Sequence, residues 1–270
     1  FRNATLFTSG AEATLSHNRR GEAAVTIRET AGQGALPQDH DRDKNRMLAP
    51  GSPWLQELGI AGAGGAILPS SQAKWRQINK FLEIVSALHR SAGLANGRRI
   101  ADMGCGKGYL TFALYEYLTG AGLAPRITGV EQRAELVAFC NAVAQRSGFT
   151  GLQFEAGRIG EWETGSLDAL IALHACDTAT DEAIAAGIRA GATVIITSPC
   201  CQRQVRQAMP PPALLSPLLR HGILMERQAE ILTDGLRALL MEAHGYRTSV
   251  FEFISTEHTA KNLMITGIRQ

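Results

Sequence analysis

Short apolar runs alternate with longer amphipathic stretches from residue 98 to the end of the chain. Five runs with strand character occupy residues 99–104, 126–132, 152–157, 167–176 and 192–199. Three stretches with helical spacing lie between them, at 109–118, 134–148 and 181–191. Strands that alternate with helices in this way are typical of a parallel sheet covered by helices on both faces. The pattern therefore predicts a doubly wound α/β domain.

The two ends of the chain depart from this alternation. Near the C-terminus, a helical region at 214–244 is followed by two consecutive strand-like runs, 247–255 and 262–269. Two strands without a helix between them are expected to pair antiparallel at an edge of the sheet.

Residues 1–50 show little helical periodicity, apart from a short strand-like run at 25–30, and pass into a segment rich in Gly, Pro and charge. From Ser70, apolar residues recur at helical spacing, with a serine available as N-cap. We therefore expect an N-terminal extension or arm at 1–50, a helical cap or linker at 51–97 and the main domain at 98–270.

Composition narrows the class of protein. The chain has 270 residues, of which 45% are hydrophobic and 19% charged, enough to bury a substantial core. The net charge of +2 does not by itself indicate a nucleic-acid partner. No apolar run reaches the roughly 18 residues of a membrane span. Five cysteines form no recognisable disulfide framework, so a cytoplasmic location is expected.

Three glycines, Gly104, Gly106 and Gly108, follow a strand and an acidic residue, Asp102, and lead directly into a helix. Glycines in such a place let a ligand approach the free N–H groups of the helix N-terminus. The spacing is not G-x-G-x-x-G, and the P-loop lysine pattern is absent. Glu131 ends the next strand, where a carboxylate accepts hydrogen bonds from the two hydroxyls of a ribose. These features predict a nucleoside cofactor without a 2′-phosphate.

The D-x-G-x-G-x-G pattern resembles motif I of class I S-adenosylmethionine-dependent methyltransferases. The resemblance implies a Rossmann-like fold with a mostly parallel seven-stranded sheet and an antiparallel edge hairpin. It also implies S-adenosylmethionine as the cofactor. By this resemblance the cofactor-binding residues are Asp102, Gly104, Cys105, Gly106, Gly108, Tyr109, Glu131, Gln132, Gly157, Arg158 and His174. Arg158 is a departure, because the family often has an acidic residue there.

Two loops with unusual composition follow the fourth and fifth predicted strands, "LHACDTATDEA" and "TSPCCQRQVR". Open α/β sheets bind ligands at the carboxyl ends of their strands, so these loops are expected to share one rim with the cofactor. The candidate catalytic residues there are His174, Cys176, Asp177, Cys200 and Cys201, and Asp181 lies beside them.

The residues of the two loops allow several kinds of chemistry. Asp177 or His174 would act as a general base during in-line methyl transfer. Alternatively, a thiolate at Cys200 or Cys201 would add to a pyrimidine ring, with Cys176 or an acid assisting product release. A zinc site of His174, Cys176, Cys200 and Cys201 is disfavoured by the adjacent cysteines, and no metal is expected. The cysteines could also be small apolar fillers.

Several segments together resemble a more specific methyltransferase family, one related to the methyltransferase domain of a eukaryotic tRNA ribose methylase. They are "DMGCGKGYLTFALYEYL", "HACDTATDEAI", "SPCCQRQVR", "TDGLRALL" and "EHTAKNLMI". The resemblance implies an RNA substrate, tRNA or rRNA. Small-molecule or protein methylation, and a non-catalytic cofactor-binding module, remain as alternatives.

Candidate substrate-binding residues are Lys74, Arg76, Lys261 and Asn262, although such groups also occur on ordinary solvated surface. Asp234 and Arg237, one helical turn apart, are expected to form a salt bridge worth only a few tenths of a kcal/mol.

Overall fold

The computed structural model describes residues 3–7, 11–17, 22–29, 47–92, 99–173, 175, 177–253 and 262–270. The chain divides into two compact units, residues 1–46 and 47–270. The first unit is an antiparallel sheet of β1 (Asn3–Phe7), β2 (Ala11–His17) and β3 (Ala23–Glu29), in the order β1-β2-β3. The sequence pattern indicated only the run within β3.

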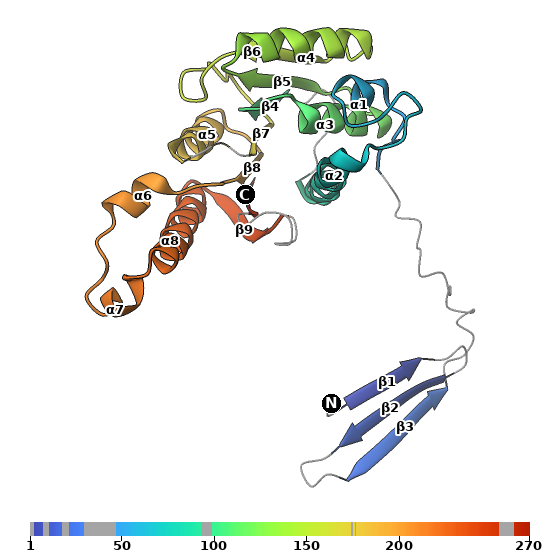
Figure 1. The fold of residues 1–270 in the computed structure, drawn as a ribbon, viewed down its shortest axis with the longest axis vertical. Coiled ribbons are helices and arrows are strands. Elements are labelled where there is room, and N and C mark those ends of the chain that lie inside the picture. Colours follow the sequence, from blue (N-terminus) through green and yellow to red (C-terminus); the bar gives the residue numbers. More distant parts are fainter. Residues whose placement is uncertain are drawn as a thin grey trace. The chain divides into compact units, whose positions relative to one another are not determined.

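The second unit is built on a seven-stranded sheet (Figure 1). Its strands are β4 (Arg99–Met103), β5 (Arg126–Glu131), β6 (Leu152–Ala156), β7 (Ala169–Leu173), β8 (Val194–Ser198), β9 (Tyr246–Glu252) and β10 (Leu263–Arg269). The order across the sheet is β6-β5-β4-β7-β8-β10-β9. The pairs among β4 to β8 are parallel, and β10 runs antiparallel to both β8 and β9. The predicted mostly parallel sheet with an antiparallel edge hairpin is confirmed.

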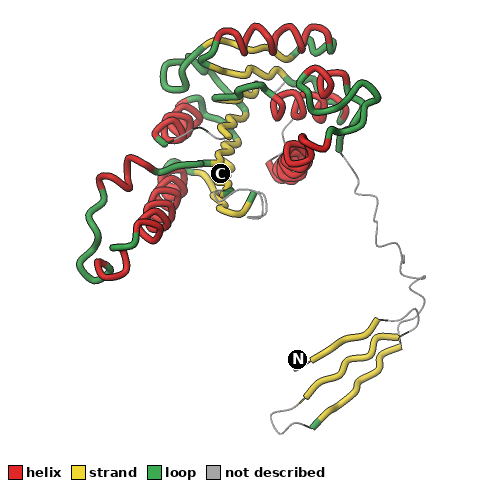
Figure 2. The backbone as a smooth tube through the Cα atoms, in the orientation of Figure 1, coloured by secondary structure: helices red, strands yellow, loops and turns green. Residues whose placement is uncertain are grey.

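Helices cover both faces of this sheet, as the tube in Figure 2 shows. They are α1 (Pro53–Glu57), α2 (Gln72–Ala92), α3 (Tyr109–Gly120), α4 (Ala134–Arg146), α5 (Thr178–Arg189), α6 (Arg203–Ala208), α7 (Ser216–Leu219) and α8 (Gly222–Ala243), with a 3₁₀ turn η1 (Pro69–Ser71) before α2. The helical region expected at 214–244 is divided into α7 and α8. Among the described residues, no helix is both long and apolar enough to cross a membrane.

The two faces follow from the alternation of side chains along each strand. In β7, Ile171 and Leu173 pack in the cluster that contains residues of α1 to α4. The neighbouring Leu170 and Ala172 pack in the cluster that contains residues of α5 and α8. Because β7 is buried on both faces, its sequence reads as a continuous apolar run rather than as an alternating one.

Residues 47–92, which precede β4, belong to the same compact unit as this sheet. Trp54 of α1 is fully buried and stacks on Phe112 of α3, with ring centroids 5.7 Å apart. Trp75 of α2 is also buried, in agreement with a role in core packing. Ser70 and Ser71, the serines available as N-cap, lie in the 3₁₀ turn η1, and the Ser71 hydroxyl donates to the Gly59 carbonyl at 3.1 Å.

One aromatic ring in the core requires glycine on the neighbouring strand. Phe154 of β6 lies in the core 5.3 Å from the Phe112 ring, measured between centroids. A methyl group at Gly129 of β5 would lie 2.5 Å from the Phe154 ring and 2.9 Å from the Cys105 sulfur. Both distances are well inside van der Waals contact, so the Phe154 ring and the loop that contains Cys105 would have to move.

We therefore expect Gly129→Ala to lower the free energy of unfolding by about 1–3 kcal/mol, the usual cost of overpacking a core. Urea unfolding of the purified protein would measure the change. Gly120→Ala is the matched control, because a side chain at this helical position meets nothing within 4 Å. Equal stabilities of the Gly129 variant and the control would contradict the packing argument.

Candidate functional site

Three neighbouring strands bring the predicted cofactor residues to one edge of the sheet. β6, β5 and β4 are adjacent and parallel, so the residues that follow them share the carboxyl edge. Gly104, Gly106 and Gly108 of the loop after β4 have φ values of 72°, 60° and 68°, which side chains rarely adopt. Gln132 and Gly157 lie directly after β5 and β6 at the same edge. The structure thus brings the predicted residues of this group together.

Asp102 is buried beneath the glycine loop and has one hydrogen-bond partner among the described side chains. The Thr111 hydroxyl, in the first turn of α3, donates to its carboxylate at 2.6 Å. Burial raises the pKa of Asp102 to about 6, although the Thr111 hydrogen bond opposes the rise. A cation placed against this carboxylate would offset its desolvation.

Glu131 is also buried, but it is held in its ionised form. Its carboxylate accepts hydrogen bonds from the Gly106 N–H at 3.0 Å and from the Arg133 N–H at 3.1 Å. The Arg133 guanidinium donates to it at 2.9 Å. Hydrogen bonding to Arg133 holds the pKa of Glu131 below its ordinary value. The carboxylate therefore has the charge and position to accept hydrogen bonds from ribose hydroxyls.

Two further loop residues are described with clear environments. The Tyr109 hydroxyl donates to the Gln77 side chain of α2 at 2.6 Å, and burial raises the pKa of Tyr109 to about 12. Burial raises the pKa of the Cys105 thiol as well, so this thiol stays neutral. The bond to Gln77 fixes the N-terminal half of α2 beside the cofactor loop.

Arg158, the departure from the family pattern, is largely exposed. Its guanidinium lies 3.3 Å from the Glu161 carboxylate, one turn further along the loop. Its neighbour Gly157 donates its N–H to the Glu131 carbonyl at 3.1 Å. Gly157 therefore belongs to the backbone of the site, while the Arg158 side chain is paired at the surface.

The candidate catalytic residues are only partly described, because His174 and Cys176 lie outside the described residues. Asp177 has φ 54° and ψ −121°, a strained conformation for a residue other than glycine. Both oxygens of its carboxylate accept from the Gln204 N–H of α6, at 3.2 Å. Asp177 thus ties the loop after β7 to the segment that follows β8. Cys200 and Cys201 lie in that segment and are partly exposed, with no disulfide among the described cysteines.

A buried guanidinium links both loops to α8. Arg237 is 3% exposed and donates to the Asp181 carboxylate at 2.7 and 3.1 Å, and to the Asp177 carbonyl at 2.9 Å. It also donates to Asp234 at 3.0 Å, and Asp234 accepts from the Gln202 amide at 3.2 Å. The pair expected to contribute a few tenths of a kcal/mol is therefore the centre of a buried network.

The candidate substrate-binding residues lie on separate elements. Lys74 and Arg76 are exposed on the first turns of α2. Asn262 is buried at the start of β10, where its carbonyl accepts from the Phe253 N–H at 2.6 Å. Lys261 lies outside the described residues. Within the described residues no group of His, Cys, Asp or Glu is arranged to hold a metal ion, and the predicted zinc alternative rests in part on residues outside them.

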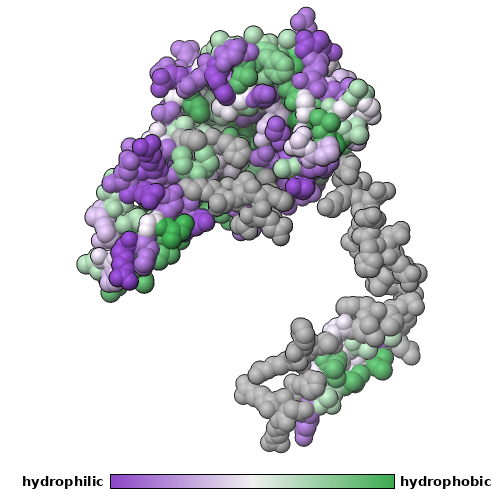
Figure 3. Space-filling view, viewed as in Figure 1, coloured by the Kyte–Doolittle hydropathy of each residue, from purple (hydrophilic) through white to green (hydrophobic). Residues whose placement is uncertain are grey.

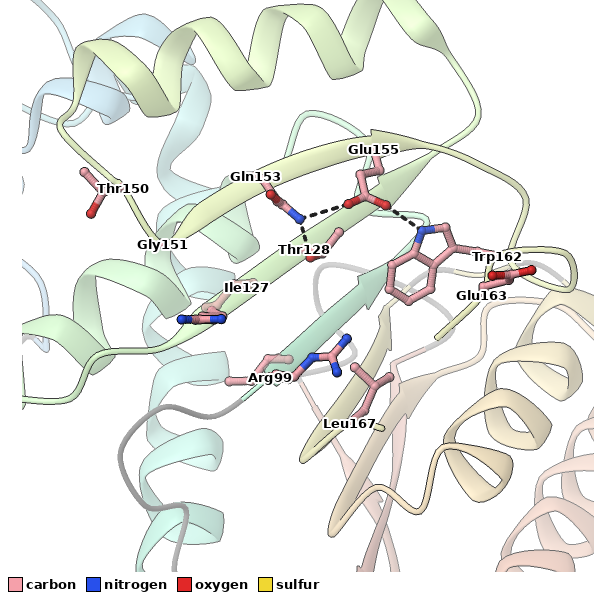
Figure 4. Close-up of a pocket in the computed structure, with 12 residues that line it drawn as sticks. Arg99, Ile127, Thr128, Thr150, Gly151, Gln153, Glu155, Trp162, Glu163 and Leu167 are labelled. Carbon is pink, nitrogen blue, oxygen red and sulfur yellow. Dashed lines mark hydrogen bonds between the residues drawn. The ribbon is translucent and has the colours of Figure 1, made fainter. Parts of the chain in front are cut away.

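A polar groove of about 660 Å³ lies on the sheet face over β4, β5 and β6, and is separate from the residues above (Figure 4). Residues 157–168, which connect β6 to β7, are all described and form no helix. In the groove, Gln153 donates to Thr128 and Glu155, and the Trp162 indole donates to Glu155 at 2.8 Å. No helix of the described residues covers this part of the sheet face, and polar side chains occupy it instead of the apolar side chains that a covering helix would bury.

Several solved structures are similar to this chain. The magnesium protoporphyrin IX methyltransferase of Synechocystis, with bound SAH, has 17% identity and a TM-score of 0.46 over 80% of this chain and 93% of its own. The precorrin-6y C5,15-methyltransferase of Geobacter metallireducens has 14% identity and a TM-score of 0.43 over 69% and 88%. The geranyl diphosphate C-methyltransferase of Streptomyces coelicolor has 12% identity and a TM-score of 0.44 over 70% and 80%. No curated protein matches the chain.

The family match decides the assignment. Residues 73–208, just over half of the chain, match the family described as methyltransferase domain. The chain belongs to this family. The strand order of its sheet gives the methyltransferase an α/β Rossmann-like fold, as predicted. Its cofactor is S-adenosylmethionine. The residues fit this group: a side chain at Gly106 would meet nothing within 4 Å, the Glu131 carboxylate accepts from the Gly106 N–H, and a positive charge would offset the burial of the Asp102 carboxylate.

Sequence reasoning missed several residues of the methyltransferase site. Thr111 and Arg133, which bind Asp102 and Glu131, belong to no recognised motif. Thr111 follows its partner by nine residues and Arg133 follows its partner by two. Gln202 was not singled out, and its pairing with Asp234 joins positions 32 residues apart. A buried polar residue is recognised only once the fold supplies its partner.

Asp102→Asn tests the electrostatics of the cofactor pocket. The folded-state pKa, about 6, lies above the ordinary 3.8, so this group's stabilising contribution is present at low pH and is lost as the pH rises through about 6. The variant should therefore be more stable than the wild type near pH 8, by roughly 1–3 kcal/mol, and equal to it near pH 4. Denaturant unfolding of the cofactor-free protein at both pH values measures this, and calorimetry should show weaker cofactor binding.

Glu131→Gln is the matched control, and its expected change in stability near pH 8 has the opposite sign. Its folded-state pKa is lowered, so its contribution is present at neutral pH and is lost as the pH falls through that lowered value. Removing its charge should therefore destabilise the protein near pH 8. A loss of stability in Asp102→Asn at this pH would show that the burial argument is wrong.

Arg237→Met tests whether α8 holds the two loops. Breaking a buried ion pair usually lowers the free energy of unfolding by about 3–5 kcal/mol. Lys80→Met on α2, where the exposed lysine pairs with the exposed Glu83, should lower it by less than about 1 kcal/mol. Arg237→Lys keeps the charge without the forked geometry, and we expect it to bind the cofactor normally while losing methyl transfer. Normal turnover in Arg237→Lys would refute the positioning role.

Proposed function

We propose that this methyltransferase transfers the methyl group of S-adenosylmethionine to an RNA nucleotide. In this proposal, the nucleotide lies between the glycine loop and the two loops that follow β7 and β8. One observation supports RNA over other acceptors: exposed basic side chains from three separate elements flank this edge of the sheet. Phosphates of a nucleic-acid backbone are the ligands that such scattered cations bind best.

The three cations are close to groups that contact the site. Lys107 is exposed within the glycine loop itself. Lys74 lies one turn before Gln77 on the same face of α2, and Gln77 accepts from Tyr109. Arg203 directly precedes Gln204, whose N–H is bound by Asp177. An acceptor strand that crosses the edge would meet all three.

The chain's own residues have three tasks in the transfer. S-adenosylmethionine, when bound, supplies a methyl group on a positively charged sulfur. Asp102 and Glu131 orient this donor, and the linked loops after β7 and β8 orient the acceptor, so that positioning provides most of the acceleration. The cofactor would supply the methyl group to the acceptor oxygen or nitrogen, and its sulfur would be left as a neutral thioether. The acceptor proton passes to Asp177 or His174 as general base.

Methyl labelling tests this proposal. The purified protein and radiolabelled S-adenosylmethionine, incubated with separate tRNA, rRNA, protein and small-molecule fractions, should label RNA. The double charge reversal Lys74→Glu with Arg203→Glu should raise the KM for that RNA by about tenfold or more without changing cofactor affinity, because two phosphate contacts are lost. The control is Arg189→Glu, which changes an exposed arginine at the C-terminal end of α5, away from the two loops. It should leave the KM unchanged.

The outcomes separate the alternatives. Label confined to the protein or small-molecule fraction would replace RNA by that acceptor class. Cofactor binding without label in any fraction would favour a non-catalytic binding module. Loss of turnover in Cys200→Ala or Cys201→Ala, with trapping of the enzyme by 5-fluoropyrimidine RNA, would replace the general base by the thiolate route.

A further inference from the structure

Helix α8 has its polar residues inside and its apolar residues outside. Its buried face carries four polar residues: Asp234 and Arg237 belong to the network described above, while Glu230 accepts from Arg227 and Thr233 donates to the Ala229 carbonyl within the helix. Its outward face carries six leucine and isoleucine side chains that are between 42% and 72% exposed: Leu224, Ile231, Leu232, Leu236, Leu239 and Leu240. In Figure 3, green hydrophobic surface appears on the lobe that contains α7 and α8.

These side chains form one continuous stripe along the helix. With 3.6 residues per turn, positions 224, 228, 231, 232, 235, 236, 239, 240, 242 and 243 share a face, which we call the outer stripe. Besides the six apolar side chains it holds Gln228, Gly235, Ala243 and, near its C-terminal end, Glu242, whose carboxylate accepts a hydrogen bond from the Thr248 hydroxyl. Single exposed leucines are common, but a contiguous apolar stripe about 24 Å long marks an interaction surface.

We propose that the outer stripe is covered by the outer stripe of a second copy of this chain, with the two helices antiparallel. A two-fold interface requires a surface that is complementary to itself. If the axis passes between Gly235 and Leu236, then Leu232 faces Leu239 and Ile231 faces Leu240 of the second copy. Leu236 then faces Gly235, where a side chain would meet nothing within 4 Å. The leucine of each copy enters the space that the glycine of the other leaves open.

The flanking charges favour the antiparallel direction. Arg227, which pairs with Glu230 of its own helix, lies beside the N-terminal end of the stripe, and Glu242 lies at its C-terminal end. When a two-fold axis relates two antiparallel helices, the N-terminal end of each stripe lies beside the C-terminal end of the other. Arg227 of one copy then lies within about one turn of Glu242 of the other, so that opposite charges are adjacent. This inference concerns assembly and does not depend on the acceptor proposed above.

Light scattering and sedimentation of the full chain test the interface. The wild type should be a dimer, and Leu236→Glu should weaken it at least about 100-fold, since two charges would be buried at the centre of the contact. Val250→Glu, an equally drastic change at an exposed position of β9, should leave the dimer intact. Unchanged thermal unfolding and cofactor affinity in Leu236→Glu would confirm that the variant is folded.

Cysteine cross-linking tests the register. Leu232→Cys combined with Leu239→Cys should form an intermolecular disulfide on mild oxidation, and Leu232→Cys alone should give no more than the wild type with its native cysteines. Efficient cross-linking of the single variant would indicate a parallel pair and overturn the proposed geometry. A wild-type chain that stays monomeric up to about 100 µM, where even weak contacts of about −5 kcal/mol form, would overturn the proposal, even if another protein or a lipid surface then bound the stripe.

Discussion

The arrangement of the acceptor side depends on one buried guanidinium. Arg237 is surrounded by protein, and a buried charge of this kind is tolerated only when its donors are paired. Its partners come from α5, from the strained residue that precedes α5, and from α8 itself. Because Asp234 also receives Gln202 from beyond β8, both loops next to the cofactor edge are fixed relative to one helix. The positions of the loops are therefore fixed by residues of α8, which need not contact a substrate.

This demand explains the reversed polarity of α8. A helix on the surface of a sheet normally turns apolar residues inward, and here two of the inward positions, Asp234 and Arg237, are polar because they bind the loops. Met241 and Ala238 still pack against the sheet, so the helix remains anchored near its C-terminal end. The apolar residues that remain lie outside, where only another protein surface can remove them from water. The same helix thus serves the acceptor loops on one side and assembly on the other.

Much of the fold was predictable because its signals are local. The glycine loop, its helix and Glu131 lie within thirty residues, and the strand runs were clear from apolar content alone. The Arg237 network could not be predicted in this way, since Asp181 and Arg237 are 56 residues apart and meet only after the sheet has formed. The two extra strands β1 and β2 were also missed, because runs such as "NATLF" are too short to be distinguished from a linker. The predicted weak pair at Asp234 and Arg237 was underestimated for one reason: a sequence shows spacing along a helix but not burial.

The cofactor side uses a different balance of charge. Asp102 in β4 and Glu131 at the end of β5 point to the same face of the sheet, yet their environments move their pKa values in opposite directions. Glu131 is stabilised as an anion by backbone N–H groups and Arg133, so it is ready to accept neutral hydroxyls. Asp102 lacks such donors apart from Thr111, so its charge is costly until a cation arrives. A ligand with hydroxyls at one end and positive charge at the other satisfies both carboxylates at once, whereas a neutral nucleoside satisfies only Glu131. If these two carboxylates hold the cofactor, the site would bind the charged methyl donor in preference to its neutral fragments.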